Sequence, residues 1–181
     1  MSPPRPSVLG LALVCSMAAQ AAFCLPDDST KAIHITSDQA LRDEKRGITI
    51  YRGNVELDQG SLHISANRIT IFRIVEDGDK IIAEGQPATL QQQPNIDEEL
   101  VRAQAEIIEY YKDEDRVRLK NSAHIQRGGS TVTGETIDYF IAKELVKASS
   151  DKSQVNSRVE VVIPATTLQD SEGDSGTADS K

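Results

Sequence analysis

The sequence has 181 residues, of which 27% are charged and 38% apolar, with three histidines, two cysteines and no tryptophan. This length suits one domain of ordinary size, and the formal net charge of -8 argues against a general nucleic-acid binder, which would need a basic face. Both cysteines, Cys15 and Cys24, lie near the N-terminus, which leaves no disulfide framework or cysteine metal site for the rest of the chain.

Residues 1–21 are typical of a cleaved secretory signal peptide. Residues 8–19 form an apolar run, and Ala19-Gln20-Ala21 matches an A-x-A cleavage site. Cleavage after Cys24 is an alternative. A membrane anchor is another, but the apolar run is shorter than the about 20 residues that span a bilayer. We therefore expect an exported protein, which in a bacterium resides in the periplasm or beyond, with a short linker over residues 22–30.

Short strands and turns fill the chain from residue 31 to residue 163. Apolar and polar residues alternate in most of these strands, which places the apolar side chains on one face. The predicted strands span residues 31–36, 47–51, 55–58, 62–65, 69–75, 80–84, 88–91, 105–111, 116–120, 143–148 and 158–163, with others inside 121–140. The predicted turns lie at residues 52–54, 76–79, 85–87 and 112–115, with a turn or exposed half-hairpin at 40–46 and a mobile loop at 92–98.

An internal repeat supports this assignment. Residues 53–72 recur without a gap 68 positions later, as residues 121–140, with Ile69 matching Ile137. A weaker copy lies between them and a partial one covers residues 33–37. The repeat favours a strand for 105–111, although the preceding residues have helical propensity. Repetition of one small unit predicts strands that stack on one another and share a core.

The turn spacing predicts an all-β fold of the sandwich or barrel type. Its inward-facing residues are mid-sized and mostly aliphatic, and they form one continuous apolar interior. Two interpretations remain open, namely a filled core or an interior that admits acyl chains. The inward set is Ile35, Ile48, Ile50, Val55, Leu57, Leu62, Ile64, Ile69, Ile71, Leu90, Ile108, Tyr110, Val117, Leu119, Ile125, Val132, Ile137 and Tyr139.

A stack of this kind has two open ends, near residues 31–36 and 158–163. Exposed edge strands invite pairing with another chain, and capping by flanking segments is the alternative. The edge residues are Ile33, Ile35, Val159, Val161 and Ile163. Residues 165–181 form an acidic tail with few apolar members, which predicts disorder.

Catalytic motifs are missing from the sequence. His34, His63 and His124 each occupy a polar position of a strand, and none has metal-ligand spacing to another. Neither a G-x-S-x-G elbow nor a glycine-rich phosphate loop is present. We therefore expect a protein that is not an enzyme and needs no cofactor.

Four motifs in order carry a resemblance to a known family. They are I-x-I-x-S-D-Q-A at residues 33–40, G-N-V-x-L-x-Q-G-x-x-x-I-x-A-x-x-I-x-I at 53–71, A-E-G-x-P-A-x-L at 83–90, and A-E-I-I-E-Y at 105–110. With the export signal, they resemble the LptA (OstA-like) family of periplasmic lipopolysaccharide-transport bridge proteins. The resemblance covers about residues 31–163, which is nearly the whole of the mature domain, the domain itself being expected over residues 31–164.

The resemblance implies a twisted antiparallel β-jellyroll that is open at both ends. It also implies that copies join head to tail through their terminal strands and bridge components of the transport machinery in the inner and outer membranes. Lipid A acyl chains would lie in the apolar interior, with the headgroup in water near Arg42, Lys45, Arg46 or Arg52. An ATPase elsewhere would supply the energy, so no cofactor is implied.

Other assignments remain. The same fold is expected in a membrane-anchored partner and in the N-terminal part of an outer-membrane translocon, but the cleavable signal argues against the first and the lack of a large barrel domain against the second. An exported polysaccharide-binding β-repeat protein would need aromatic sugar platforms, and the chain has no tryptophan. A structural filament would polymerise without binding lipid.

Overall fold

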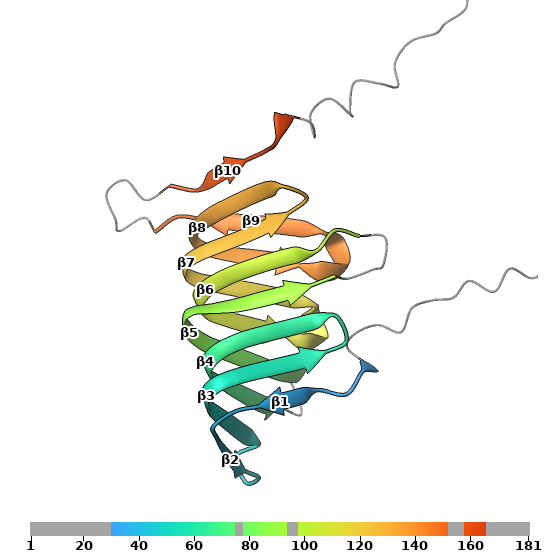
Figure 1. The fold of residues 1–181 in the computed structure, drawn as a ribbon, viewed down its shortest axis with the longest axis vertical. Helices are drawn as coiled ribbons and strands as arrows, with labels where there is room; N and C mark the ends of the chain where they lie inside the picture. The colour runs from blue at the N-terminus through green and yellow to red at the C-terminus, as the bar shows by residue number, and fades with distance from the viewer. Residues whose placement is uncertain (1–29, 75–77, 94–97, 152–157, 166–181) are drawn as a thin grey trace, which may run out of the picture.

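The described part of the chain forms one ten-stranded antiparallel sheet that stacks strand upon strand (Figure 1). The computed structural model describes residues 30–74, 78–93, 98–151 and 158–165. The predicted signal peptide lies outside these residues, as do nearly all of the predicted linker and acidic tail. Within the described residues, no helix has both the length and the apolar character needed to cross a membrane.

Strand order follows the chain through the centre of the sheet, as β3-β4-β5-β6-β7-β8, with two short strands at each end. The strands are β1 (His34–Thr36), β2 (Gln39–Asp43), β3 (Ile48–Gln59), β4 (Leu62–Ile74), β5 (Gly78–Gln92), β6 (Val101–Tyr111), β7 (Arg116–Arg127), β8 (Ser130–Phe140), β9 (Leu145–Ser149) and β10 (Glu160–Val162), with short 3-10 helices η2 (Lys112–Glu114) and η3 (Ile141–Lys143). All-β architecture, as the alternation predicts, is therefore confirmed.

Each pair of neighbouring long strands has a register shift near its middle, which divides the sheet into two arms. Figure 1 shows the arms as two layers of strands, one in front of the other. Arm A contains β2, β9 and residues 48–52, 68–74, 78–84, 107–111, 116–120 and 136–140. Arm B contains β1, β10 and residues 55–59, 62–66, 88–92, 101–105, 123–127 and 130–134.

The predicted turns at residues 52–54 and 85–87 are wrong, because the chain bends there without reversing. Residues 52–54 lie within β3, where Gly53 and Asn54 have φ of 77° and 43°. Residues 85–87 lie within β5, between the paired Glu84 and Ala88. Glycine and asparagine tolerate positive φ, which produces a bulge as readily as a turn. The corner between the arms follows these bulges.

The corner between the arms recurs in the second copy of the repeat. Asn121 and Ser122, which match Gly53 and Asn54, have φ of 62° and 52° and lie at the register shift of β7. The weaker copy is a strand as well, since β6 runs through residues 105–111. The turn at residues 112–115 is confirmed as η2, closed by Asp115 with φ of 44°. Residues 94–97 of the predicted mobile loop lie outside the described residues.

One apolar cluster fills the space between the arms. Of the predicted inward set, all are buried in this cluster or packed against it except Ile48 and Ile50. Alanines at inward positions, which sequence reasoning passed over, complete it. They are Ala66, Ala83, Ala88, Ala103, Ala105 and Ala123, and they are accompanied by Ile81 and Val101.

The inward assignment of Ile48 and Ile50 is wrong. Tyr51 pairs with the core residue Ile69, whereas Ile50 pairs with Thr70 and Ile48 with Phe72. Directly paired residues of an antiparallel sheet share a face, so Tyr51 is inward and the two isoleucines are outward. Both are only partly buried. The strand has two isoleucines at one parity and Thr49 and Tyr51 at the other, and only its register reveals which face meets the core.

Candidate functional site

The interior consists of two facing rows of apolar side chains, one on each arm. In arm A, the register aligns Ile69, Ala83, Ile108, Leu119 and Ile137 on successive strands. In arm B, it aligns Leu57, Ile64, Leu90, Ala103 and Ile125 in the same way. The interior is therefore continuous from strand to strand along the stack, without a polar residue in either row.

These rows are tightly packed in the present conformation. Leu57, Ile64, Ile69, Leu119 and Ile137 are all 0% exposed, so that not even a water-sized probe reaches them. Burying an aliphatic side chain of this size stabilises a protein by about 1.5–3 kcal/mol. Of the two interpretations left open by the sequence, the filled core describes this conformation. An acyl chain can lie between the rows only if the arms move apart.

Small side chains line the corner on its inner face. Ala88 pairs with Ala105, Val55 with Ala66, and Ala123 with Gly134. Side chains of this size let the two arms approach closely where the strands bend. The arms are therefore close together at the corner, and the bulkier residues lie farther out along each arm.

The stack is open at its N-terminal end, where β1 and β2 diverge. A cleft of about 690 Å³ opens there, lined on its apolar side by Ile35, Tyr51 and Ile71 and on its polar side by Arg42 and Arg73. Asp43, Glu44 and Asp79 also line it, so the cleft carries charges of both signs. This amphipathic mouth leads directly to residues packed against the core.

The proposed headgroup cations are distributed unevenly around this mouth. Arg42 lines the cleft, with its Nε 3.5 Å from Glu44 Oε1. Arg46 Nε lies 3.6 Å from Asp43 Oδ2, while Lys45 and Arg52 are exposed. Of these four basic residues, Arg42 is thus the one that lines the cleft, and it also lies on β2, the edge strand of arm A.

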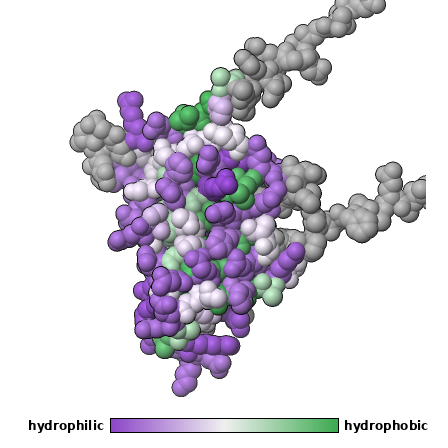
Figure 2. Space-filling model, viewed as in Figure 1, coloured by the Kyte–Doolittle hydropathy of each residue, from purple (hydrophilic) through white to green (hydrophobic). Residues whose placement is uncertain are grey.

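The terminal strands form the edges of the sheet. β1 and β10 are the edge strands of arm B, and both lie in the segments that the sequence predicted as edges. β2 and β9 are the edge strands of arm A, and the sequence did not predict them as edges. Apolar side chains are exposed there, and Figure 2 shows an apolar patch over β10. The exposed fractions include 39% for Ile33, 57% for Leu41, 54% for Val161, 53% for Val162 and 49% for Ile163.

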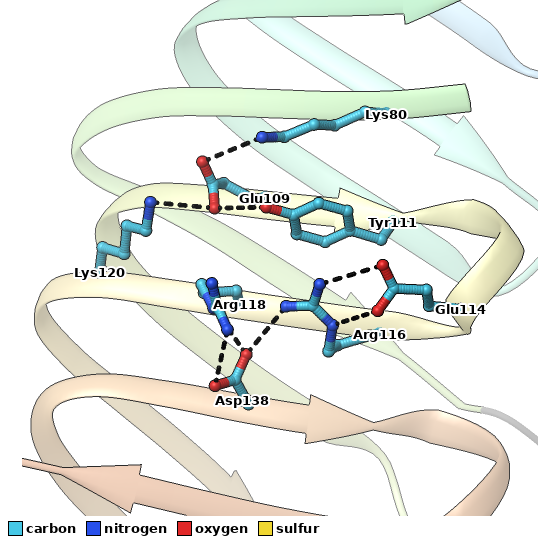
Figure 3. Close-up of polar contacts among 8 residues, drawn as sticks. All are labelled: Lys80, Glu109, Tyr111, Glu114, Arg116, Arg118, Lys120 and Asp138. Carbon is cyan, nitrogen blue, oxygen red and sulfur yellow. Dashed lines mark hydrogen bonds and ion pairs between the residues drawn. The ribbon is translucent and has the colours of Figure 1, made fainter. Parts of the chain in front are cut away.

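A ladder of ion pairs crosses the outer face of arm A (Figure 3). Glu109 on β6 accepts from Lys80 on β5 at 3.3 Å and from Lys120 on β7 at 3.1 Å. Asp138 on β8 accepts from Arg118 at 2.7 Å and Arg116 at 3.1 Å. The ladder thus joins four consecutive strands. Sequence reasoning missed it, although opposite charges at matched outward positions were a possible signal.

Tyr111 and Glu114 connect the two parts of the ladder. The Arg116 guanidinium lies 3.9 Å from the centroid of the Tyr111 ring and donates to Glu114 at 2.7 Å. The Tyr111 hydroxyl donates to Glu109 at 3.0 Å. Because Glu109 is 6% exposed and Arg116 8%, these ion pairs are screened less by water than exposed pairs.

The ladder changes the acidity of its carboxylates. Burial acts to raise the pKa of Glu109, but hydrogen bonds from Lys120 and Tyr111 outweigh it and hold this pKa below its ordinary value. The pKa of Asp138 is likewise lowered, because hydrogen bonds from Arg118 and Arg116 outweigh its burial. Both carboxylates therefore remain charged and paired at neutral pH.

The histidines form no metal centre in the described structure. His63 contacts Asp58 at 2.7 Å through Nδ1 and Glu56 at 3.2 Å through Nε2, so its two nitrogens serve different carboxylates. Among the described residues, no group of three or more His, Cys, Asp and Glu could hold a metal ion. His63 is best described as one part of a polar surface on arm B.

Comparisons with known proteins match this architecture. The family model described as LptA/(LptD N-terminal domain) LPS transport protein matches residues 34–145. The lipopolysaccharide export system protein LptH of Pseudomonas aeruginosa is 32% identical over 163 residues, which cover 87% of this chain and 92% of LptH. LptA of Escherichia coli K12 is 32% identical over 166 residues, which cover 90% of this chain and 88% of LptA.

A solved structure agrees with the fold. The crystal structure of LptH, described as the LptA homologous periplasmic component of the lipopolysaccharide transport device of Pseudomonas aeruginosa, superposes with a TM-score of 0.71 at 32% identity. The match covers 77% of this chain and 99% of LptH. The open stack of bent strands, the family model and these relatives lead to one conclusion. The chain belongs to the LptA/(LptD N-terminal domain) family of lipopolysaccharide transport proteins.

Proposed function

We propose that this protein is a periplasmic carrier that holds the acyl chains of lipopolysaccharide between its two arms. In this role it bridges inner-membrane and outer-membrane components of the transport machinery. The observation that carries the proposal is the continuous apolar interior, which runs from strand to strand and reaches an open mouth at the N-terminal end. Transport of this kind binds and releases its ligand unchanged, and so it requires neither a catalytic group nor a cofactor in this chain.

Acyl-chain binding follows from the chemistry of the interior. Each CH₂ group removed from water contributes about 0.8 kcal/mol, and a chain between the two rows would contact mainly apolar side chains. A phosphorylated headgroup would stay in water, where Arg42 and Arg73 at the mouth could neutralise part of its charge. The predicted inward residues other than Ile48 and Ile50 are the proposed lipid contacts.

Head-to-tail assembly is the second part of the proposal. At the N-terminal end, β1 and β2 run antiparallel to β3, and at the C-terminal end, β9 and β10 run antiparallel to β8. The directions of the six central strands alternate, so β9 and β10 of one copy would meet β2 and β1 of the next in antiparallel orientation. Both arms, and the interior between them, would then continue into the next copy.

Export places the carrier where such a bridge is needed. We assign residues 1–21 to a cleaved signal peptide, residues 31–164 to the jellyroll domain and residues 165–181 to an acidic tail. Relatives that bear the names of lipopolysaccharide export proteins support the periplasmic location. N-terminal sequencing of protein purified from the periplasm would test the first of these assignments directly.

The experiment is photo-crosslinking to lipopolysaccharide in the purified exported chain. A photo-reactive residue at Ile137, which is inward and 0% exposed, should crosslink to added lipopolysaccharide in a saturable manner. The matched control is Thr136, the preceding residue on the same strand, whose side chain lies on the outer face. Saturable crosslinking at Ile137 alone supports the carrier. If the protein assembles but neither position crosslinks, it is a structural filament.

A further inference from the structure

Polar side chains mark the inward face of arm B at its open rim, the edge of the arm opposite the corner. Gln59, Gln92 and Arg127 are the last inward residues of β3, β5 and β7, respectively. The two glutamines are only 2% and 6% exposed. Because this rim faces the corresponding rim of arm A, its polar groups decide what holds the two arms together on the open side.

Arg127 joins the two arms. Its Nη2 forms ion pairs with Glu144 Oε2 at 2.9 Å and with Glu98 Oε2 at 3.4 Å. Glu144 follows η3 and belongs to the rim of arm A, whereas Glu98 precedes β6 on the rim of arm B. The contact with Glu144 therefore crosses the open side, and the contact with Glu98 does not.

A buried hydroxyl lies behind this contact. Tyr139, on the inward face of arm A, is 2% exposed, and its Oη makes no hydrogen bond of good geometry, although Arg127 lies close to it. Burial raises the pKa of Tyr139, while the charge of Arg127 acts to lower it and those of Glu98 and Glu144 to raise it. The phenol thus lies within the field of the three rim charges. A buried hydroxyl without a well-formed hydrogen bond is costly.

The repeat supplies an internal comparison. Gln59 occupies the position that matches Arg127, 68 residues earlier. Its Nε2 donates to the backbone oxygen of Lys31 at 2.9 Å, and Lys31 precedes β1, an edge strand of the same arm. The contact therefore stays within arm B. Of these two matched positions, only the C-terminal one carries a charge that reaches across to arm A.

We propose that Arg127 is a positioning residue that latches the open side of the jellyroll at its C-terminal end and so controls the loading of acyl chains between the arms. This inference rests on the proposed carrier function. The interior leaves no room beside Ile137 and Leu119, so a chain enters only when the arms part about their corner. Parting at this end requires the Arg127–Glu144 contact to break.

The test measures opening and loading separately. A cysteine at Ile137, in the exported chain with Cys24 replaced by Ala, reports opening through its rate of maleimide labelling. Stopped-flow mixing with purified lipopolysaccharide reports loading. The latch variants are Arg127→Met and Glu144→Gln, with Arg127→Lys as the conservative replacement. Arg118→Met is the matched control, because it breaks an ion pair of 2.7 Å with Asp138 on the outer face of arm A.

Both latch variants should raise the labelling rate and the lipopolysaccharide association rate by about two- to fivefold, as expected for loss of a partly exposed ion pair. Arg127→Lys should restore most of the wild-type rates. Arg118→Met should change neither rate beyond its effect on global stability, and Glu98→Gln should have a smaller effect than Glu144→Gln.

The outcomes separate the latch from the carrier function. An unchanged maleimide-labelling rate in both latch variants would overturn the latch, whatever the association rate of lipopolysaccharide. Faster labelling with an unchanged association rate would show that opening at this rim does not control loading, which also overturns the proposal. Faster labelling in a protein that binds no lipopolysaccharide would show that the Arg127–Glu144 contact restrains the arms. The same result would refute the proposed carrier function, and with it any role of Arg127 in loading.

Discussion

The two ends of the stack differ in how their arms are held. One row on the outer face of arm A runs from Ile50 through Thr70 and Ile82 to Glu109, Arg118 and Asp138. Its N-terminal part is largely uncharged, and the arms there diverge around an open cleft. Its C-terminal part is the ion ladder, and the arms there are joined through Arg127.

This difference arises although the two halves share a repeat. The repeat preserves the inward aliphatic residues and the corner, which both halves need for a common core. It does not preserve the outward and rim residues, which contribute less to burial and are free to differ. The N-terminal end therefore has an open cleft between the arms. At the C-terminal end, ion pairs join the strands of arm A and also join arm A to arm B.

The largest expected effect comes from charging the shared core. Ile137→Asp and its repeat equivalent Ile69→Asp would each bury a carboxylate among side chains that are 0% exposed. Each should cost more than about 3 kcal/mol of unfolding free energy, measured by urea denaturation. Ile50→Asp, on the outer face, is the control and should cost about 1 kcal/mol or less. A folded Ile137→Asp protein that bound lipopolysaccharide as well as wild type would contradict the inward assignment.

Acid should destabilise the C-terminal part more than the N-terminal part. The folded-state pKa values of Glu109 and Asp138 lie below the ordinary values of 4.5 and 3.8. Their stabilisation is thus fully present above these ordinary values and is lost as pH falls through the lower folded values. Hydrogen exchange measured from pH 5 downward should show β6–β8 losing protection before β3 and β4.

Glu109→Gln isolates the ladder's share of this effect. The variant leaves Lys80 and Lys120 without their carboxylate and should cost about 1–3 kcal/mol at neutral pH. The penalty should shrink as the pH approaches the folded pKa of the wild-type carboxylate, because wild type then loses the same charge. A penalty that stays constant between pH 7 and pH 3 would show that packing, and not charge, accounts for it.

Tyr139→Phe should produce a smaller change, in the opposite direction. Removing a buried hydroxyl that lacks a well-formed hydrogen bond should leave stability unchanged or raise it by up to about 1 kcal/mol, since the ring and its packing remain. Thermal denaturation measures this difference. A loss above about 1 kcal/mol would mean that the hydroxyl makes an interaction important for the C-terminal rim.

Edge substitutions should have the smallest effect on folding. Val161→Asp on β10 and Ile33→Asp beside β1 replace residues that are 54% and 39% exposed, so each should alter stability by about 0.5 kcal/mol or less. Each should nevertheless weaken self-association, measured by sedimentation equilibrium, because a charge would enter the continued interior. Assembly that is insensitive to both substitutions would exclude these edges as the junction.

Much of the architecture can be predicted from the sequence because alternation and repetition are local signals. Leu57, Ile64, Ile69 and Ile137 follow one polar-apolar period, and the core cluster contains them all. The signal fails where the more apolar parity of a strand faces outward, as at Ile48 and Ile50. It fails also where a glycine or asparagine bends a strand, as at Gly53, since the same residues favour turns.

The sequence by itself determined the all-β class, the stacked repeat, most of the inward face and the terminal edge strands of arm B, because burial of apolar side chains imposes a period of two on each strand. Only the tertiary structure decided which strands continue through the corner, which face Ile50 takes, and which charges meet. Glu109 with Lys80, and Arg127 with Glu144, lie 29 and 17 positions apart in the sequence. Such contacts depend on the register of the sheet and on the closure of one arm over the other, which no local pattern encodes.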